Sequence, residues 1–164
     1  MANVFNVAKL GIANGTIDLD TDTFDMLLLT TSPAATLTGA QYDLTTVTGV
    51  LGDAGFVEAA DSSYTTTTNG RRNVVVTTAT QNDTSDEAEA KYTPDGSGGA
   101  ATWTSLDNDL ITGCLVYKRD TALGSANDGA AIPVAFCDLT SNVQANGGDV
   151  TIDFTGDIWL TLGN

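Results

Sequence analysis

The chain has 164 residues, and its 21 Asp and Glu against 6 Lys and Arg give a formal net charge of −15. It lacks the basic surface that neutralises phosphates, so we expect no nucleic-acid partner and no binding to an anionic membrane. Histidine is absent, which removes the commonest general base and the commonest zinc or haem ligand. These features disfavour hydrolytic and metal-redox enzymes, and they indicate a structural or binding role without a cofactor.

The composition also favours strands over helices. Charged residues make up 16% of the chain, and Thr is abundant while Lys and Glu are scarce. Lys and Glu usually cover the solvent face of a helix, whereas β-branched Thr suits a strand. We therefore predict an all-β antiparallel β-sandwich or jelly-roll-like single domain over residues 15–164, with long loops and at most short helical turns. Residues 1–14 form an N-terminal arm or a short helix before it.

The first third of the chain mixes strand patterns with a long connection. Val4–Gly11 fits a short helix or an extended arm, and a turn follows at Asn14-Gly15. Apolar and acidic residues alternate over Thr16–Asp20, which predicts a strand, and an apolar run predicts another over Phe24–Thr31. Ser32–Gly55 is rich in Gly and is expected to be a connection. Within it we predict one helical turn from Asp43 to Val47, with Asp43 as its N-cap.

Later segments repeat the strand pattern at short intervals. The predicted strands are Phe56–Ala60, Tyr64–Thr68, Arg72–Thr80, Ala88–Tyr92, Thr102–Ser105, Leu110–Lys118, Ala131–Leu139, Asp149–Phe154 and Asp157–Leu162. Helix is the alternative for Ala88–Tyr92, because Glu87 and Lys91 have helical spacing. Asn69-Gly70 is a hairpin-turn signal, and Pro133 indicates a sheet edge or a bulge. The last two strands are expected to pair as a hairpin around Gly156.

Asp18, Asp20 and Asp22 form a D-x-D-x-D pattern whose oxygen atoms suit calcium. The sequence does not match an EF-hand loop, because Thr23 stands at the sixth position in place of Gly and Leu29 at the twelfth in place of Glu. We predict a solvated strand edge and turn, and calcium binding is the alternative.

The cysteines and tryptophans are expected to be structural. Cys114 and Cys137 fall in different predicted strands, as buried free thiols or as a single disulfide. Trp103 and Trp159 are expected in the core or an interface rather than as platforms for a sugar.

Four of the six basic residues occur as adjacent pairs, Arg71-Arg72 and Lys118-Arg119. In so acidic a chain, clustered cations need anionic neighbours. The first interpretation is ion pairing within the domain. The second is docking on acidic patches of a neighbouring subunit, because Arg is common in interfaces. Arg71, Arg72, Lys118 and Arg119 are therefore the candidate interface residues.

Several segments resemble a family of small virion proteins of tailed bacteriophages. These segments are GTIDLDTDTFDMLLLT (Gly15–Thr30), LVYKRD (Leu115–Asp120), IPVAFCDL (Ile132–Leu139) and NGGDVTIDF (Asn146–Phe154). They cover about half of the chain in order, whereas residues 32–91 have no counterpart, and Leu19 stands where the family often has an aromatic residue.

The resemblance implies a β-rich virion component with no catalytic residues. Its expected role is a capsid decoration (cement) protein on the exterior of the head, made in the host cytoplasm. Its expected partners are the major capsid protein and further copies of itself, as a homodimer or homotrimer. The alternative is a tail or fibre component that binds a host-surface receptor or glycan.

Overall fold

The computed structural model describes residues 3–33, 36–60, 62–64, 70–82, 87–94, 100–107, 109–120, 127–153 and 160–162. Its helices are α1 (Asn6–Asn14), α2 (Gly39–Tyr42) and α3 (Val47–Gly52). Its strands are β1 (Asn3–Val4), β2 (Phe24–Thr31), β3 (Val57–Glu58), β4 (Arg72–Asn82), β5 (Glu87–Pro94), β6 (Ala100–Leu106), β7 (Leu110–Lys118), β8 (Ile132–Gln144), β9 (Gly148–Asp153) and β10 (Leu160–Leu162). The strands form antiparallel sheets in a sandwich-like domain, which confirms the predicted fold class.

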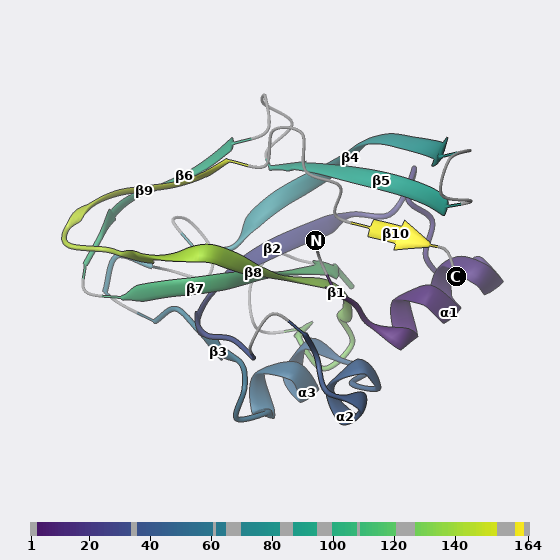
Figure 1. The fold of residues 1–164 in the computed structure, drawn as a ribbon, viewed down its shortest axis with the longest axis horizontal. Helices are drawn as coiled ribbons and strands as arrows, with labels where there is room; N and C mark the ends of the chain where they lie inside the picture. Colours follow the sequence, from purple (N-terminus) through teal and green to yellow (C-terminus); the bar gives the residue numbers. More distant parts are fainter. Residues whose placement is uncertain are drawn as a thin grey trace.

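The main sheet has the strand order β1-β8-β7-β2-β4-β5-β10, and β3 pairs with β2 beside this path. Strands β6 and β9 form a separate two-stranded sheet. Figure 1 shows β6 and β9 arching away from β7 and β8, and it shows α2 and α3 together on the other side of the sheet.

The second layer arises because one long antiparallel ribbon bends. Leu110 pairs with Gln144 at the end of the β7–β8 ladder, and Leu106 pairs with Gly148 at the start of the β6–β9 ladder. At the corner, Gly147 has φ +77°, and its backbone N–H donates to Leu106 O at 2.8 Å. A positive φ costs glycine nothing, so this residue lets the ribbon fold over the sheet.

Strand β2 is buried on both faces, which explains its continuous apolar sequence. Phe24, Met26 and Leu28 share one core cluster with residues of β6 and β9, including Trp103 and Val150. Leu27 and Leu29 belong to a second cluster on the opposite face. That second cluster also contains Phe5, Leu37, Val47, Val50, Phe56, Leu115, Tyr117, Ala131 and Phe136. The segment that carries α2 and α3 therefore covers the face that β6 and β9 leave open.

The N-terminal segment is a helix packed on the domain and not an extended arm. Strand β1 pairs with Ala135 and Phe136 of β8, and Phe5 and Ala8 are fully buried. Gly15 ends α1 with φ +76°, which agrees with the predicted turn at this position. None of the described helices is long and apolar enough to cross a membrane.

Strands β2 and β7 have the predicted bounds, and β5 confirms the strand interpretation of Ala88–Tyr92. Of the two positions that Pro133 indicated, a sheet edge or a bulge, the structure has the bulge: the β7–β8 register shifts between Val116 and Tyr117, and Tyr117 pairs with Pro133. The Asn69-Gly70 signal falls partly outside the described residues.

Two local predictions in the first third of the chain were wrong. Thr16–Asp20 forms a turn rather than a strand, because its carboxylates bond to the local backbone. The predicted helical turn is replaced by α2 and α3, and Asp43 is the C-cap of α2. The N-caps are Thr38 and Thr46, whose hydroxyls accept bonds from the backbone N–H groups three residues later.

The predicted C-terminal hairpin was also wrong. Strand β9 pairs with β6, whereas β10 pairs with β5 in the main sheet. The two strands therefore belong to different layers. The residues around Gly156 lie outside the described part of the chain.

A substitution at Gly113 tests how closely β7 and β8 approach each other. A Cβ atom at this position would lie 2.6 Å from the backbone oxygen of Cys137, which is part of the ladder and cannot move alone. We expect G113A to lower the free energy of unfolding by about 1–3 kcal/mol. Chemical denaturation followed by circular dichroism measures the change.

Gly148 supplies the matched control, because a Cβ atom there meets nothing within 4 Å. We expect G148A to change the free energy of unfolding by less than about 0.5 kcal/mol. Equal losses in G113A and G148A would contradict the close approach of the two strands.

Candidate functional site

Arg71 lies inside the domain and not on an outer surface. Its guanidinium is bracketed by two carboxylates from segments far apart in the sequence. Nη2 is 2.6 Å from Glu58 Oε2, and Nη1 is 2.5 Å from Asp128 Oδ1. The residue is 1% exposed, and the guanidinium carbon lies 5.4 Å from the ring centroid of Tyr117. Of the two interpretations of the basic pairs, Arg71 follows the first, ion pairing within the domain.

The surroundings of Arg71 hold its charge in place. Burial lowers the pKa of the guanidinium, but the hydrogen bonds to Glu58 and Asp128 outweigh this effect and raise the pKa overall. The Tyr64 hydroxyl donates to Glu58 Oε1 at 3.1 Å and accepts from the Leu28 backbone N–H at 3.2 Å. We call Arg71, Glu58, Asp128, Tyr64 and Tyr117 the Arg71 cluster.

Arg119 neutralises the one acidic residue of β2. Asp25 is fully buried among apolar neighbours, and the guanidinium of Arg119 binds both of its carboxylate oxygens, with Nε 2.6 Å from Oδ2. The hydrogen bond to Asp25 raises the pKa of Arg119. The Arg119 backbone N–H also donates to Thr23 O at 2.9 Å. This pair compensates a carboxylate that burial would otherwise destabilise.

Arg72 joins the two layers of the sandwich. Its Nη2 donates to the Thr102 carbonyl on β6 at 2.8 Å, and its guanidinium lies 5.7 Å from the Trp103 ring centroid. The indole N–H of Trp103 donates to Gly70 O at 2.5 Å, and the ring is fully buried. Trp103 is thus a core residue, one of the two positions expected for it. Trp159 lies outside the described residues.

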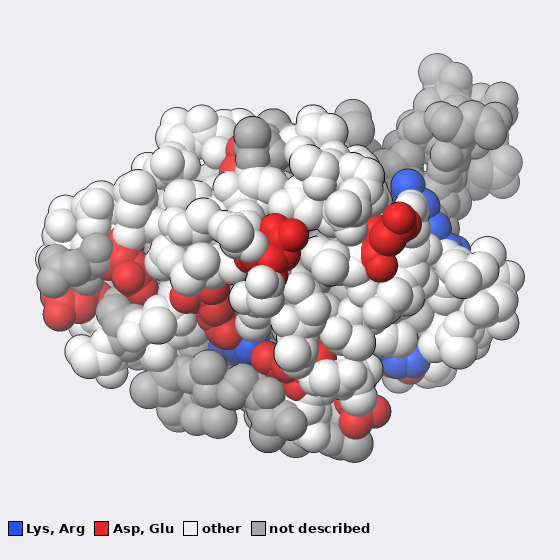
Figure 2. Space-filling view, turned by 90° about the horizontal axis from the view of Figure 1, so that it is seen from below, with Lys and Arg blue, Asp and Glu red and all other residues white. Residues whose placement is uncertain are grey.

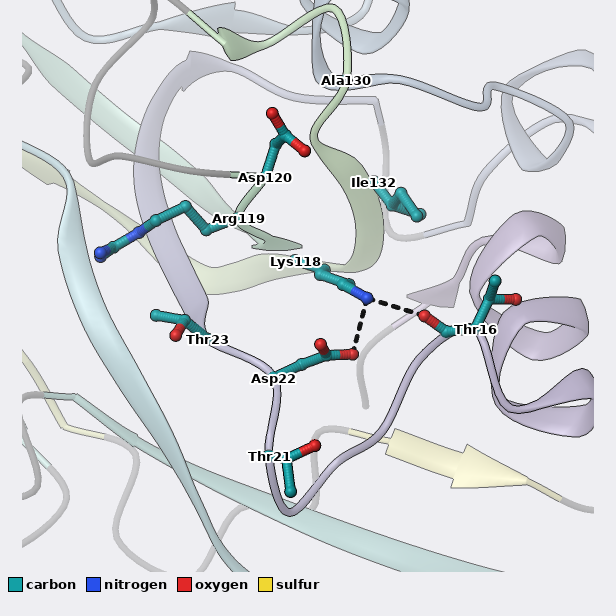
Figure 3. Close-up of a pocket in the computed structure, with 9 residues that line it drawn as sticks. All are labelled: Thr16, Thr21, Asp22, Thr23, Lys118, Arg119, Asp120, Ala130 and Ile132. Carbon is teal, nitrogen blue, oxygen red and sulfur yellow. Dashed lines mark hydrogen bonds and ion pairs between the residues drawn. The ribbon is translucent and has the colours of Figure 1, made fainter.

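Lys118 lies at a polar pocket of about 450 Å³, which Figure 3 shows. Its Nζ is 2.8 Å from Asp22 Oδ2 and donates to Thr16 O at 2.7 Å. The lining residues are Thr16, Thr21, Asp22, Thr23, Lys118, Arg119, Asp120, Ala130 and Ile132. Hydroxyl and carboxylate groups can hydrogen-bond a small polar molecule there, but the charge of Lys118 is already balanced by Asp22.

The Asp18–Asp22 segment uses its carboxylates to close its own turn. Asp22 Oδ2 accepts from the Asp18 backbone N–H at 2.8 Å, and Asp18 Oδ1 accepts from the Asp20 N–H at 2.9 Å. The second bond lowers the pKa of Asp18. Among the described residues, no group of three or more acidic or Cys side chains is placed to hold a metal ion. The structure therefore gives no support to the calcium alternative.

The candidate interface cations are all bound by groups of their own chain. Within the domain, Arg71, Lys118 and Arg119 pair with carboxylates, and Arg72 binds a carbonyl. Contact of Arg72, Lys118 or Arg119 with a neighbouring subunit stays a prediction. Among the cations with described side chains, Lys9 alone is exposed, and it lies over the ring of Tyr42.

The outer surface of the described residues is consequently acidic. The exposed carboxylates in the described ranges are Asp18, Asp20, Asp43, Asp107, Asp120 and Asp149. Figure 2 shows acidic groups spread over one face among neutral residues, with few basic groups.

The sequence interpretation missed the partners of the cations. Glu58, Asp128 and Asp25 were not singled out, and they lie 13, 57 and 94 residues from their arginines in the sequence. Asp25 carried a usable signal, because an acidic residue inside an apolar strand requires a buried partner. Glu58 and Asp128 carried no such signal.

Comparison with protein-family models, with curated proteins and with solved structures finds no significant match for this chain.

Replacing Arg71 tests its structural role. R71M leaves two largely buried carboxylates without their cation, so we expect the free energy of unfolding to fall by about 3–5 kcal/mol. K9M is the matched control, because it removes an equal charge at an exposed site, and we expect a loss below about 1 kcal/mol. Urea denaturation compares the two variants. An equally small loss in both would show that the buried pairs do not stabilise the fold.

Ionisation of the Tyr64 hydroxyl makes the free energy of unfolding depend on pH in the alkaline range. Burial, and then the charge of Glu58, raise the pKa of its hydroxyl. A raised pKa favours the neutral phenol in the folded state. This contribution is complete below the unfolded pKa of about 10 and is lost as pH rises above that value. We expect Y64F to be less stable at neutral pH but to lose less stability than wild type between about pH 9 and 11.

Urea denaturation at a series of pH values measures this difference. Parallel losses in wild type and Y64F would contradict the burial of the Tyr64 hydroxyl.

Proposed function

We propose that this protein is a non-enzymatic virion structural protein, a capsid decoration protein that binds adjacent subunits of the major capsid protein and stabilises the head. The observation that carries the proposal is the convergence of three of the four segments that resemble the phage family. Gly15–Thr30 supplies the Asp18–Asp22 turn and β2, Leu115–Asp120 ends β7, and Ile132–Leu139 begins β8. These three segments are neighbours in the main sheet and line the Lys118 pocket together.

The distribution of charge supports the same role. A protein that coats a shell must stay dispersed at high concentration before it binds. Arg71 and Arg119 are engaged inside the domain, and the surface carboxylates repel other copies. A docking surface for this chain on the capsid would therefore be neutral or basic, and its binding would weaken as the ionic strength rises.

The docking surface would be rigid. Residues 3–14, for which an extended arm was one expectation, and the segment of α2 and α3, which was expected to be a connection, both pack on the main sheet. Binding through preformed surfaces costs less conformational entropy than ordering an extended arm. A homodimer or homotrimer on the shell would use the same kind of contact.

One observation favours the alternative, a tail or fibre component that binds a receptor or glycan. The Lys118 pocket offers hydroxyls and carboxylates to a small polar ligand. Against this stands the burial of Trp103, which leaves that ring unavailable for stacking on a sugar.

Copy number in the virion tests the proposal. We expect on the order of hundreds of copies per particle, because a decoration protein follows the repeating lattice of the shell. Cryo-electron microscopy of the same particles is expected to place the protein on the outside of the head. Far fewer copies, with density confined to the tail, would contradict the proposal and favour the alternative.

Reconstitution then measures the stabilisation and locates the docking surface. Heads that lack the protein are mixed with wild type, and we expect them to release their DNA at a higher temperature. L10D and L110D change exposed apolar residues near opposite ends of β8. If one of these two residues contacts the shell, the variant at that residue no longer binds the heads. The variant at the other residue still binds and serves as the control. Failure of the wild type to bind the heads would contradict the proposal.

A further inference from the structure

Cys114 and Cys137 are directly opposite each other in the β7–β8 ladder. Neither is in a disulfide, and both contact the core cluster that lies beneath β6 and β9. Opposed residues of an antiparallel pair have Cα atoms about 4.5 or 5.5 Å apart and side chains on the same face. Both separations lie within the range of about 4.4–6.8 Å that a disulfide spans. The Cα spacing of the two strands therefore permits a disulfide between the cysteines.

The ladder is irregular on both sides of this pair. The register shifts between Ile111 and Gly113, and again between Val116 and Tyr117. A regular ladder places Cβ atoms about 4.5–5.5 Å apart, and a disulfide needs about 3.5–4.5 Å. Bulges allow local bending and twisting of a strand. The short paired stretch between the two shifts can therefore close the remaining gap.

The two thiols differ in access to solvent. Cys114 is fully buried, whereas Cys137 is partly exposed. The neighbouring Cys137 thiol and burial both raise the pKa of Cys114. An oxidant therefore meets Cys137 first, and Cys114 lies behind it as the resolving thiol.

We propose that Cys114 and Cys137 are a redox modification site, at which a small-molecule disulfide such as glutathione disulfide converts the thiol pair into an intramolecular bridge between β7 and β8. The inference is independent of the function proposed above.

The reaction takes place in two exchanges. The Cys137 thiolate attacks one sulfur of glutathione disulfide, which forms a mixed disulfide and releases one glutathione thiolate. The Cys114 sulfur then attacks Cys137 Sγ and displaces the second glutathione. The cysteines lose two protons and two electrons, and glutathione disulfide gains both to become two glutathione molecules. Closure speeds up as pH rises, because the thiolate is the attacking form.

The bridge would tie together the ends of a chain segment that carries one member of each internal ion pair. Arg119 and Asp128 lie between the cysteines, and they bind Asp25 and Arg71. Tethering the ends of this segment restricts the unfolded chain more than the folded one. We expect the oxidised protein to have a Tm higher by about 5–10 °C.

Peptide mapping of the full-length protein tests the site. Reduced, folded protein is incubated with glutathione disulfide, alkylated, denatured and digested with trypsin without a reductant. Cleavage at Lys91, Lys118 and Arg119 places Cys114 in residues 92–118 and Cys137 in residues 120–164. We expect these peptides to be joined, at the sum of their masses less two hydrogen atoms, and to separate on reduction. Calorimetry is expected to show the higher Tm.

Two variants supply the controls. C114A keeps the accessible thiol and is expected to retain a glutathione adduct on Cys137, without the rise in Tm. C137A keeps the buried thiol and is expected to react more slowly than C114A. The proposal is overturned if wild type stops at the glutathione adduct or forms a dimer through Cys137. It is also overturned if the joined peptide appears only after denaturation.

Discussion

The structure depends on how a strongly acidic chain uses its few cations. Arg71 and Arg119 are directed inward, where each neutralises carboxylates that the fold has removed from water. Removing one partner of such a pair leaves a charge in a medium of low polarity, which costs several kcal/mol. The cations therefore hold together segments that are distant in sequence, and the carboxylates that remain outside determine the surface.

One of these ion pairs lies on the central strand. β2 is covered by the β6–β9 layer on one face and by the segment of α2 and α3 on the other, so its backbone is shielded on both sides. Asp25 is the single polar residue in this run of six buried residues, and Arg119 at the end of β7 reaches it. Packing and charge compensation thus reinforce each other at one place in the sheet.

These features agree with a binding protein that presents a preformed surface. The N-terminal helix and the long connection are part of the packed domain, so little of the described chain has to become ordered when a partner binds. The proposed bridge between Cys114 and Cys137 would add a covalent tie between β7 and β8, next to the segment that supplies Asp128 and Arg119.

The sequence by itself determined the strand-rich class and the bounds of β2 and β7, because apolar patterns and β-branched residues act locally. It also identified the basic pairs as residues that need anionic neighbours. It could not choose between a subunit interface and the interior for Arg71, since Glu58 and Asp128 reach it only when distant segments assemble. Tertiary structure alone decided that β9 and β10 belong to different sheets, because strand pairing depends on contacts that no local pattern encodes.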